Sequence, residues 1–277
     1  MDKIGFIGFG SMGSMLISGF LDSDVLLPSQ IIVTTRTKEK LHPLSQRWSQ
    51  IFIADDQVTV AQNSDILFLC VKPLETIPLL NEIKEHIQKN CHLVSIAACV
   101  RIANLEALYK GEITKVIPTL TSEVKEGTSL FCHNSLVTKE SASILETMFQ
   151  GIGKVKIINE NDFEVAADLT SCAPGMIAAI FQNFIDGGLR HSNLSPEAAF
   201  EMVISTLFGT AKLLREKNMT FSEMTSRVAT KGGITEEGVQ VLNHGLPDIF
   251  NDVFTKTLAK HEHVKQMVSQ EVKKIIG

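Results

Sequence analysis

The chain has 277 residues, of which 44% are hydrophobic and 21% charged, so it can bury one large core or two smaller ones. Its formal net charge is −5, and acidic and basic residues are mixed along the length, which excludes the basic stripe of a nucleic-acid-binding protein. The N-terminus lacks the regions of a signal peptide, and no apolar run approaches the roughly 20 residues of a membrane span. We therefore expect a globular cytoplasmic protein.

The first half of the chain alternates short apolar runs with amphipathic stretches long enough for helices. Five runs predict buried strands, at Ile4–Ile7, Ile31–Thr34, Ile66–Val71, Leu93–Ala97 and Lys115–Ile117. Further edge strands are expected at two apolar segments, Thr128–Phe131 and Val155–Ile158. Strands that alternate with helices predict an α/β fold with a doubly wound parallel sheet covered on both faces.

The second half changes to a helical pattern at about Asp162, where apolar residues begin to recur every three or four positions. The spacing predicts helices at Phe163–Leu169, Met176–Leu189, Pro196–Glu216, Phe221–Val228, Glu236–Asn243 and Leu246–Ile276. We expect a sheet domain over residues 1–160 and an all-α domain over residues 161–277. The predicted helices Met176–Leu189 and Pro196–Glu216 are apolar over more than one face. This pattern favours cover by another subunit, although a monomer with a well-filled helical core is an alternative.

A glycine fingerprint joins the first strand to the first helix. It reads Gly8-Phe9-Gly10-Ser11-Met12-Gly13, and this strand-to-helix context is the one that dinucleotide binding requires. Gly8 permits the tight turn, Gly10 lets the backbone approach a pyrophosphate, and Gly13 allows close packing of helix on strand. The fingerprint predicts a Rossmann-type domain whose phosphate site is formed by Ile7, Gly8, Phe9, Gly10, Ser11, Met12 and Gly13.

The ends of three later strands are expected to complete a cofactor site. Thr35 and Arg36 follow the second strand, where no Asp or Glu stands to hold a free ribose 2′-hydroxyl, so they favour NADP(H) with NAD(H) as an alternative. A solvent-facing arginine would give the same pattern. Two further strands end in segments that we expect beside the cofactor, Cys70-Val71-Lys72-Pro73 and Ala97-Ala98.

The cysteines and histidines give no metal-ligand spacing. Cys70, Cys91, Cys99, Cys132 and Cys172 include no CxxC pair, and we interpret them as buried structural thiols. His261 and His263 lie in a polar helical stretch, where a solvated helix face is expected rather than a ligand pair. No metal site is predicted.

The motifs together resemble the pyrroline-5-carboxylate reductase family over nearly the whole chain. They are GFIGFGSMG, FLCVKP, VSIAACV, KVIPTLTSEVKEG, DGGL, GTAKLL and RVATKGGITEEGV, in that order. The resemblance implies reduction of the cyclic imine 1-pyrroline-5-carboxylate to proline with a nicotinamide cofactor, usually NADPH. It also implies an N-terminal dinucleotide domain and a C-terminal helical domain that forms a homodimer or a higher oligomer.

The resemblance also implies where the substrate would bind. The family's substrate-binding segment corresponds to Thr230–Thr235, so Gly232, Gly233 and Ile234 would meet the substrate and Thr235 would be the catalytic hydroxyl facing the imine. Glu160 corresponds to an acidic residue of the family on the substrate side, with Asp162 and Glu164 as nearby alternatives. From the residues alone, an ordinary glycine turn before a helix explains the same segment.

Five positions depart from the family pattern, and they cluster around the expected pocket: Cys99, Thr119, Cys172, Met176 and Lys231. These departures leave open a divergent member, similar to the late-competence ComER-like branch, that binds NADP but has an altered substrate or a non-catalytic role. A dehydrogenase of the 3-hydroxyacid class is a third possibility, but Lys212 lacks the nearby asparagine expected of that class.

Overall fold

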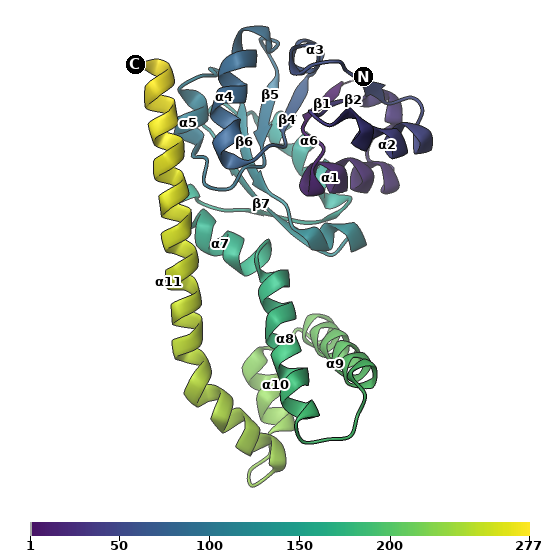
Figure 1. Ribbon diagram of the computed structural model, residues 1–277, viewed down its shortest axis with the longest axis vertical. Helices are drawn as coiled ribbons and strands as arrows, with labels where there is room; N and C mark the ends of the chain where they lie inside the picture. Colours follow the sequence, from purple (N-terminus) through teal and green to yellow (C-terminus); the bar gives the residue numbers. More distant parts are fainter. Residues whose placement is uncertain (1) are drawn as a thin grey trace. The chain divides into compact units, whose positions relative to one another are not determined.

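The computed structural model describes residues 2–277, which form two compact units (Figure 1). The first unit holds Met1–Pro174 together with the final segment Thr257–Gly277, and the second unit holds Gly175–Lys256. The predicted boundary near residue 160 follows the last strand in sequence. The compact units divide later, and the end of the chain belongs with the sheet.

The first unit is built on one eight-stranded sheet in the order β3-β2-β1-β4-β5-β6-β7-β8. Its strands are β1 (Ile4–Ile7), β2 (Ile31–Thr34), β3 (Phe52–Ile53), β4 (Ile66–Leu69), β5 (His92–Ser95), β6 (Ile113–Ile117), β7 (Gly127–His133) and β8 (Gly153–Ile157). Every neighbouring pair is parallel except β6 and β7, which are antiparallel. The strand order reverses at β1, because β2 and β4 lie on either side of it.

The predicted doubly wound sheet is confirmed, with local corrections. Sequence analysis missed β3, which has only two residues and therefore too short an apolar run to recognise. The segment Thr128–Phe131 was expected at an edge, but β7 lies inside the sheet between β6 and β8. The strands β4 and β5 also end two residues earlier than predicted, which places Cys70, Val71, Ile96 and Ala97 in the loops beyond the sheet.

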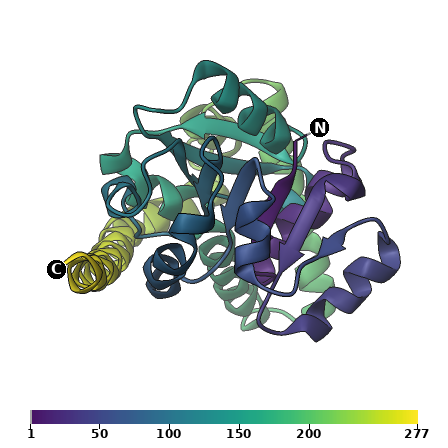
Figure 2. The same cartoon turned by 90° about the horizontal axis from the view of Figure 1, so that it is seen from above.

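Helices cover both faces of the sheet (Figure 2), and an apolar core lies between the strands and the helices on each face. On one face, Phe6 and Phe68 stack with ring centroids 4.7 Å apart and pack under α1 (Ser11–Asp22) and α6 (Lys139–Gln150). On the other face, alternate strand residues such as Leu67 pack under α3 (Gln57–Gln62), α4 (Pro73–Ile83) and α5 (Ile102–Glu106). Val268 and Val272, near the end of the chain, complete this second core. Strand alternation therefore distributes the side chains between two buried layers.

The helices after the sheet are α7 (Phe163–Thr170), α8 (Ala173–Leu189), α9 (Pro196–Glu216), α10 (Phe221–Val228) and α11 (Ile234–Ile276). The bounds of α9 and α10 agree with the prediction. The prediction of two helices at 236–243 and 246–276 was wrong, because α11 runs through Pro247 without a break. A proline removes one backbone donor from a helix, and the helical pattern on both sides outweighs that local cost of about 3 kcal/mol.

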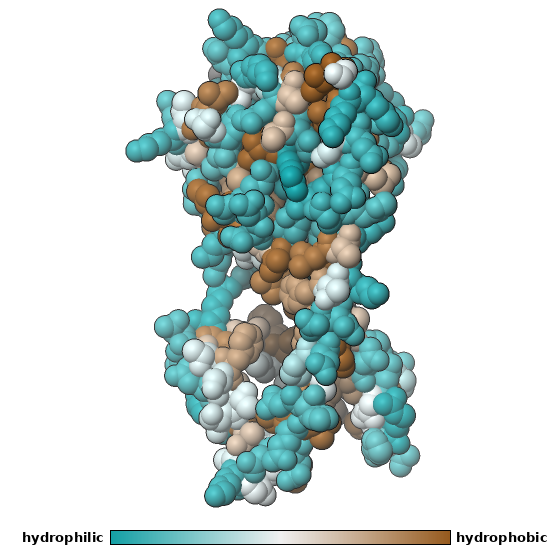
Figure 3. All heavy atoms as spheres, turned by 90° about the vertical axis from the view of Figure 1, so that its left-hand side faces the viewer, coloured by the Kyte–Doolittle hydropathy of each residue, from teal (hydrophilic) through white to brown (hydrophobic). Residues whose placement is uncertain are grey.

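Large apolar side chains are exposed on the helical unit (Figure 3). They include Ile177, Ile180 and Phe184 of α8, and Phe200, Ile204 and Phe208 of α9. The helical stretch Glu160–Leu189 is also long and apolar enough to cross a membrane by length and composition alone. The helical unit thus presents apolar surface that another molecule can cover.

Candidate functional site

A cavity of about 820 Å³ lies at the carboxyl ends of β1, β2 and β4. Nine of the predicted cofactor residues line it: Ile7, Gly8, Phe9, Gly10, Thr35, Arg36, Cys70, Val71 and Lys72. The lining does not include the other six, Ser11, Met12, Gly13, Pro73, Ala97 and Ala98. Because the strand order reverses at β1, the cavity is at the position where doubly wound sheets bind their ligands.

The three fingerprint glycines have three different surroundings. Gly8 adopts φ +108°, and a β-carbon there would collide with the carbonyl oxygen of Cys70. A β-carbon on Gly13 would lie 2.5 Å from the carbonyl oxygen of Gly8, so this glycine lets α1 pack against the strand end. At Gly10, a β-carbon would meet nothing within 4 Å among the described residues. Gly8 and Gly13 are therefore needed by the fold, whereas Gly10 faces open space.

The start of α1 suits an anion. Gly10 is the N-cap residue in an extended conformation, and no described side chain caps it by a hydrogen bond. The first turn of α1 also contains no acidic residue. Unpaired N–H groups and the positive end of the helix dipole favour a phosphate at this position. The residues present therefore fit the diphosphate of a dinucleotide.

Charged side chains line the end of the cavity beyond β2. Arg36 donates from Nη2 to Glu75 Oε1 at 2.8 Å, and the Arg36 side chain is 86% exposed. Lys38 is turned toward the strand ends, where its Nζ donates to Thr34 Oγ1 at 2.7 Å and to the Ala54 carbonyl at 2.6 Å. Sequence analysis missed Lys38, Lys40 and Glu75. The segment Lys72–Glu75 does carry a helix-start pattern, but nothing in it indicates a contact with Arg36, 39 residues away.

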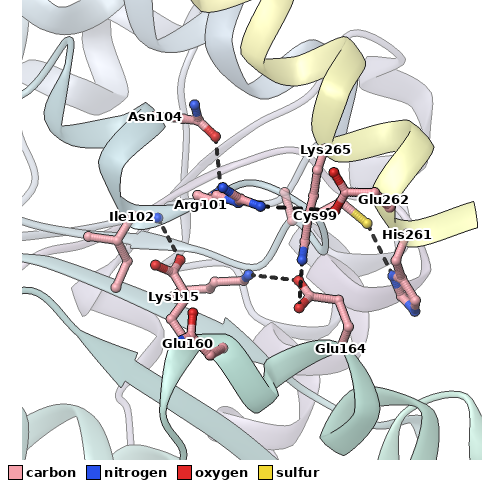
Figure 4. A network of polar contacts seen from close by, with 12 residues as sticks. Cys99, Arg101, Ile102, Asn104, Lys115, Glu160, Glu164, His261, Glu262 and Lys265 are labelled. Carbon is pink, nitrogen blue, oxygen red and sulfur yellow. Dashed lines mark hydrogen bonds and ion pairs between the residues drawn. The ribbon is translucent and has the colours of Figure 1, made fainter. Parts of the chain in front are cut away.

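A network of polar contacts lies where α7 and the end of α11 pack against the sheet (Figure 4). Glu164 is its centre, with Lys265 Nζ 2.8 Å from Oε2 and Lys115 Nζ 3.8 Å from Oε1. The Lys115 side chain is only 1% exposed, and its Nζ lies 4.6 Å from the centroid of the Phe163 ring. Burial lowers the pKa of Lys115, whereas the nearby Glu164 carboxylate raises it. One carboxylate thus compensates two lysines.

A second branch of this network joins a thiol, an imidazole and a carboxylate. Cys99 Sγ lies 3.2 Å from His261 Nδ1, and His261 Nε2 lies 3.1 Å from Asp168 Oδ1. Thr257 donates to the other oxygen of Asp168 at 2.6 Å. Burial raises the pKa of the Cys99 thiol to about 11. The expectation that His261 belongs to a solvated face was wrong, because this part of α11 packs against the sheet unit.

The predicted substrate residues are found in both units. In the sheet unit, Glu160 Oε1 accepts a hydrogen bond from the Ile102 backbone N–H at 2.7 Å. In the helical unit, Gly232 has φ +75° and donates its N–H to Glu236 Oε2 at 2.7 Å. Ile234 is 95% exposed, and the exposed Thr235 lies in the first turn of α11. The segment is therefore a glycine turn that opens a helix, and the N–H groups of Gly232 and Gly233 are hydrogen-bonded within it.

The positions that depart from the family pattern differ in how far they are buried. Thr119 is buried, and its hydroxyl lies 3.3 Å from the Thr121 hydroxyl. Cys172 and Met176 are half-buried, and Lys231 is exposed. Within residues 2–277, no group of three or more His, Cys, Asp or Glu side chains is arranged to hold a metal ion.

Comparison with known proteins identifies the family. Residues 3–99 match the family model described as NADP oxidoreductase, coenzyme F420-dependent, and residues 160–264 match that described as pyrroline-5-carboxylate reductase dimerisation. Pyrroline-5-carboxylate reductase 3 of Bacillus subtilis is 39% identical over 98% of this chain and 100% of its own length. ComE operon protein 4 of the same organism is 32% identical over 94% of this chain and 95% of its own length.

Solved structures agree with this likeness. The pyrroline-5-carboxylate reductase of Coxiella burnetii superimposes with a TM-score of 0.86 at 25% identity, covering 95% of this chain and 98% of its own. The Plasmodium falciparum pyrroline carboxylate reductase with NADP bound has the same fold, with a TM-score of 0.84 at 24% identity, covering 96% of this chain and 98% of its own. The chain belongs to the pyrroline-5-carboxylate reductase family.

Proposed function

We propose that this protein is an oxidoreductase that reduces 1-pyrroline-5-carboxylate to L-proline, a reaction at a CH–NH bond in proline biosynthesis. The observation that carries the proposal is the 39% identity to pyrroline-5-carboxylate reductase 3 across 98% of the chain. The glycine fingerprint Gly8–Gly13 supports it, because the start of α1 suits a phosphate and lies beside a cavity of dinucleotide size. A cytoplasmic location belongs to the same proposal.

The cofactor in this proposal is NADP(H), with NAD(H) as the alternative, and it supplies the hydride when bound. Gly10 and the start of α1 would hold the diphosphate, while Thr35 and Arg36 would meet the ribose 2′ position. Cys70, Val71 and Lys72 line the same cavity and would contact the remainder of the molecule. Tight placement of both reactants supplies much of the rate enhancement in a hydride transfer.

The substrate in this proposal is held by the segment at the start of α11. The Gly232 N–H already donates to a carboxylate, that of Glu236, so it has an orientation suited to the carboxylate of an amino-acid-like substrate. Gly232 and Gly233 allow close approach of the substrate to the backbone. Thr235, in the first turn of the helix, is the proposed hydroxyl that orients the imine or relays its proton.

The proposed assembly is a homodimer formed through the C-terminal helices. Residues 160–264 match the dimerisation model of the family, and the same residues carry the exposed apolar side chains of α8 and α9. Cover by a second copy would remove this apolar surface from water.

The test is turnover of 1-pyrroline-5-carboxylate with NADPH or NADH, followed by absorbance at 340 nm. Thr235→Ala is expected to lower kcat/KM by about 100-fold or more, because a positioned proton-transfer group contributes at least that factor. Thr206→Ala is the matched control, since the Thr206 hydroxyl donates to the Met202 carbonyl of its own helix at 2.8 Å. An equal loss in both variants would remove the assigned role of Thr235.

A second candidate function is a cofactor-binding family member with an altered substrate or a non-catalytic, competence-related role. The departures at Thr119, Cys172, Met176 and Lys231 favour it, as does the 32% identity to ComE operon protein 4. It predicts that the wild-type protein binds NADPH or NADH without reducing 1-pyrroline-5-carboxylate. Turnover that Thr235→Ala abolishes would exclude it.

A further inference from the structure

Two oppositely charged residues that line the cofactor cavity form an ion pair. Arg36 follows β2, and Glu75 lies in the first turn of α4. Arg36 Nη2 lies 2.8 Å from Glu75 Oε1. The guanidinium that the proposed function assigns to the ribose 2′ position is therefore already held by a carboxylate of the chain.

The Glu75 carboxylate is fixed by its own helix as well. Its Oε2 accepts a hydrogen bond from the Lys72 N–H at 3.4 Å, at the start of α4. One oxygen of Glu75 therefore faces the helix start and the other faces Arg36. If Arg36 turns to another anion, the helix start still holds the carboxylate at the cavity wall.

We propose that Glu75 sets the cofactor selectivity of this protein by weakening its preference for NADPH over NADH. This role rests on the proposed function, in which a nicotinamide dinucleotide occupies the cavity. A 2′-phosphate must take Arg36 from Glu75 and then remains near a fixed negative charge. The 2′-hydroxyl of NADH is neutral and can donate a hydrogen bond to the same carboxylate.

The other charges of the cavity separate this role from a general charge effect. Glu82 also lines the cavity, but its Oε1 accepts from Gln57 Nε2 at 2.6 Å rather than pairing with Arg36. Lys38 is directed to Thr34 and to the Ala54 carbonyl. Glu75 and Glu82 therefore add the same formal charge to one cavity, and Glu75 is the one in contact with Arg36.

The experiment measures the Kd of the intact protein for NADPH and for NADH in wild type and Glu75→Gln. The glutamine amide oxygen can still accept from the Lys72 N–H, which preserves the contact at the helix start, and thermal unfolding checks the fold. We expect NADPH to bind about two- to fivefold more tightly in Glu75→Gln, with NADH unchanged or up to about threefold weaker. The gain for NADPH should shrink as ionic strength rises, because the pair is exposed to solvent.

Two further variants make the test specific. Glu82→Gln should leave the NADPH to NADH affinity ratio within about twofold of wild type, since the pair is not removed. In an Arg36→Gln background, Glu75→Gln should improve NADPH binding less than it does in wild type, because no competition for the guanidinium remains.

The possible failures are distinct. If wild type binds both cofactors and Glu75→Gln leaves the affinity ratio unchanged, the selectivity role of Glu75 is overturned while the proposed function stands. An equal change in the ratio with Glu82→Gln overturns it too, since general charge then explains the effect. A wild-type protein that binds neither cofactor overturns the proposed function and the role of Glu75 with it.

Discussion

Gly10 and Gly13 lie within one turn of chain, yet they serve different purposes. A β-carbon at Gly10 would point into open space, whereas one at Gly13 would lie 2.5 Å from the Gly8 carbonyl oxygen. The first position is therefore free of any packing constraint from the described residues. A glycine at this position is explained by a ligand that approaches the backbone closely.

Substitution of each glycine by alanine should separate binding from folding. Gly10→Ala is expected to change the free energy of unfolding by less than about 1 kcal/mol, because Gly10 has φ −87°, a value that alanine also adopts. Cofactor affinity should fall by about tenfold or more, since the new methyl group occupies the approach to the diphosphate. Gly13→Ala should instead cost about 1–3 kcal/mol of stability through overpacking. Urea unfolding and cofactor titration measure the two effects, and unaltered affinity in Gly10→Ala would contradict the assigned diphosphate position.

Local sequence patterns indicate residues that line the cavity better than they indicate the contacts of those residues. The fingerprint glycines and Arg36 follow from a local pattern with a known physical basis. Glu75 and His261 do not, because their contacts join residues far apart in sequence and depend on how α4 and α11 pack. The Arg36–Glu75 pair spans 39 residues, and the Cys99–His261 contact spans 162.

Among the secondary-structure elements, α7 and the end of α11 are held to the sheet by buried charge. Glu164 forms ion pairs with both Lys115 and Lys265. Removing its charge would leave the buried ammonium group of Lys115 without its paired carboxylate. Glu164→Gln is therefore expected to lower the free energy of unfolding by about 3 kcal/mol, in the range measured for broken buried pairs. Lys115→Met should cost less, because an apolar chain suits the ring of Phe163.

The matched control for that experiment is Glu271→Gln. Glu271 pairs with Lys274 at 3.2 Å within α11, where the lysine side chain is 73% exposed. Loss of this surface pair should change stability by less than about 0.5 kcal/mol. Equal destabilisation by both substitutions, measured by denaturant unfolding, would show that the buried network does not hold these helices to the sheet.

Element boundaries show where periodicity stops being informative. The helices α9 and α10 begin and end where their apolar spacing predicts, and Ser195 and Thr220 fix their starts by accepting hydrogen bonds from backbone N–H groups of the first turns. By contrast, the break predicted between Asn243 and Leu246 does not occur, because α11 is continuous from Ile234 to Ile276. The antiparallel pairing of β6 with β7 was not predicted either, since strand direction depends on the connection rather than on strand composition.

At the scale of the whole molecule, the two units differ in how completely they bury their apolar residues. The sheet unit encloses both of its main cores between strands and helices. In the helical unit, only Ile185 of α8 and Ala199 of α9 are buried, among the described residues of those two helices. The sequence predicted this contrast, because α8 and α9 are apolar over more than one face and a single small unit offers too little cover.

On α9, Phe200, Ile204 and Phe208 recur every fourth residue and form an exposed apolar stripe, with Phe208 69% exposed. If a second copy covers this stripe, Phe208→Asp places a charge in a desolvated contact and should weaken dimerisation by about 30-fold or more, the equivalent of about 2 kcal/mol for a central aromatic. Light scattering over a dilution series measures this shift toward monomer. Leu136→Asp, at a 53% exposed leucine of the sheet unit, should leave the mass unchanged. Both changes add one charge to an exposed apolar position. A lower mass for Phe208→Asp alone would assign the dimer interface to α9, whereas equal masses for the two variants would show that the interface does not include Phe208.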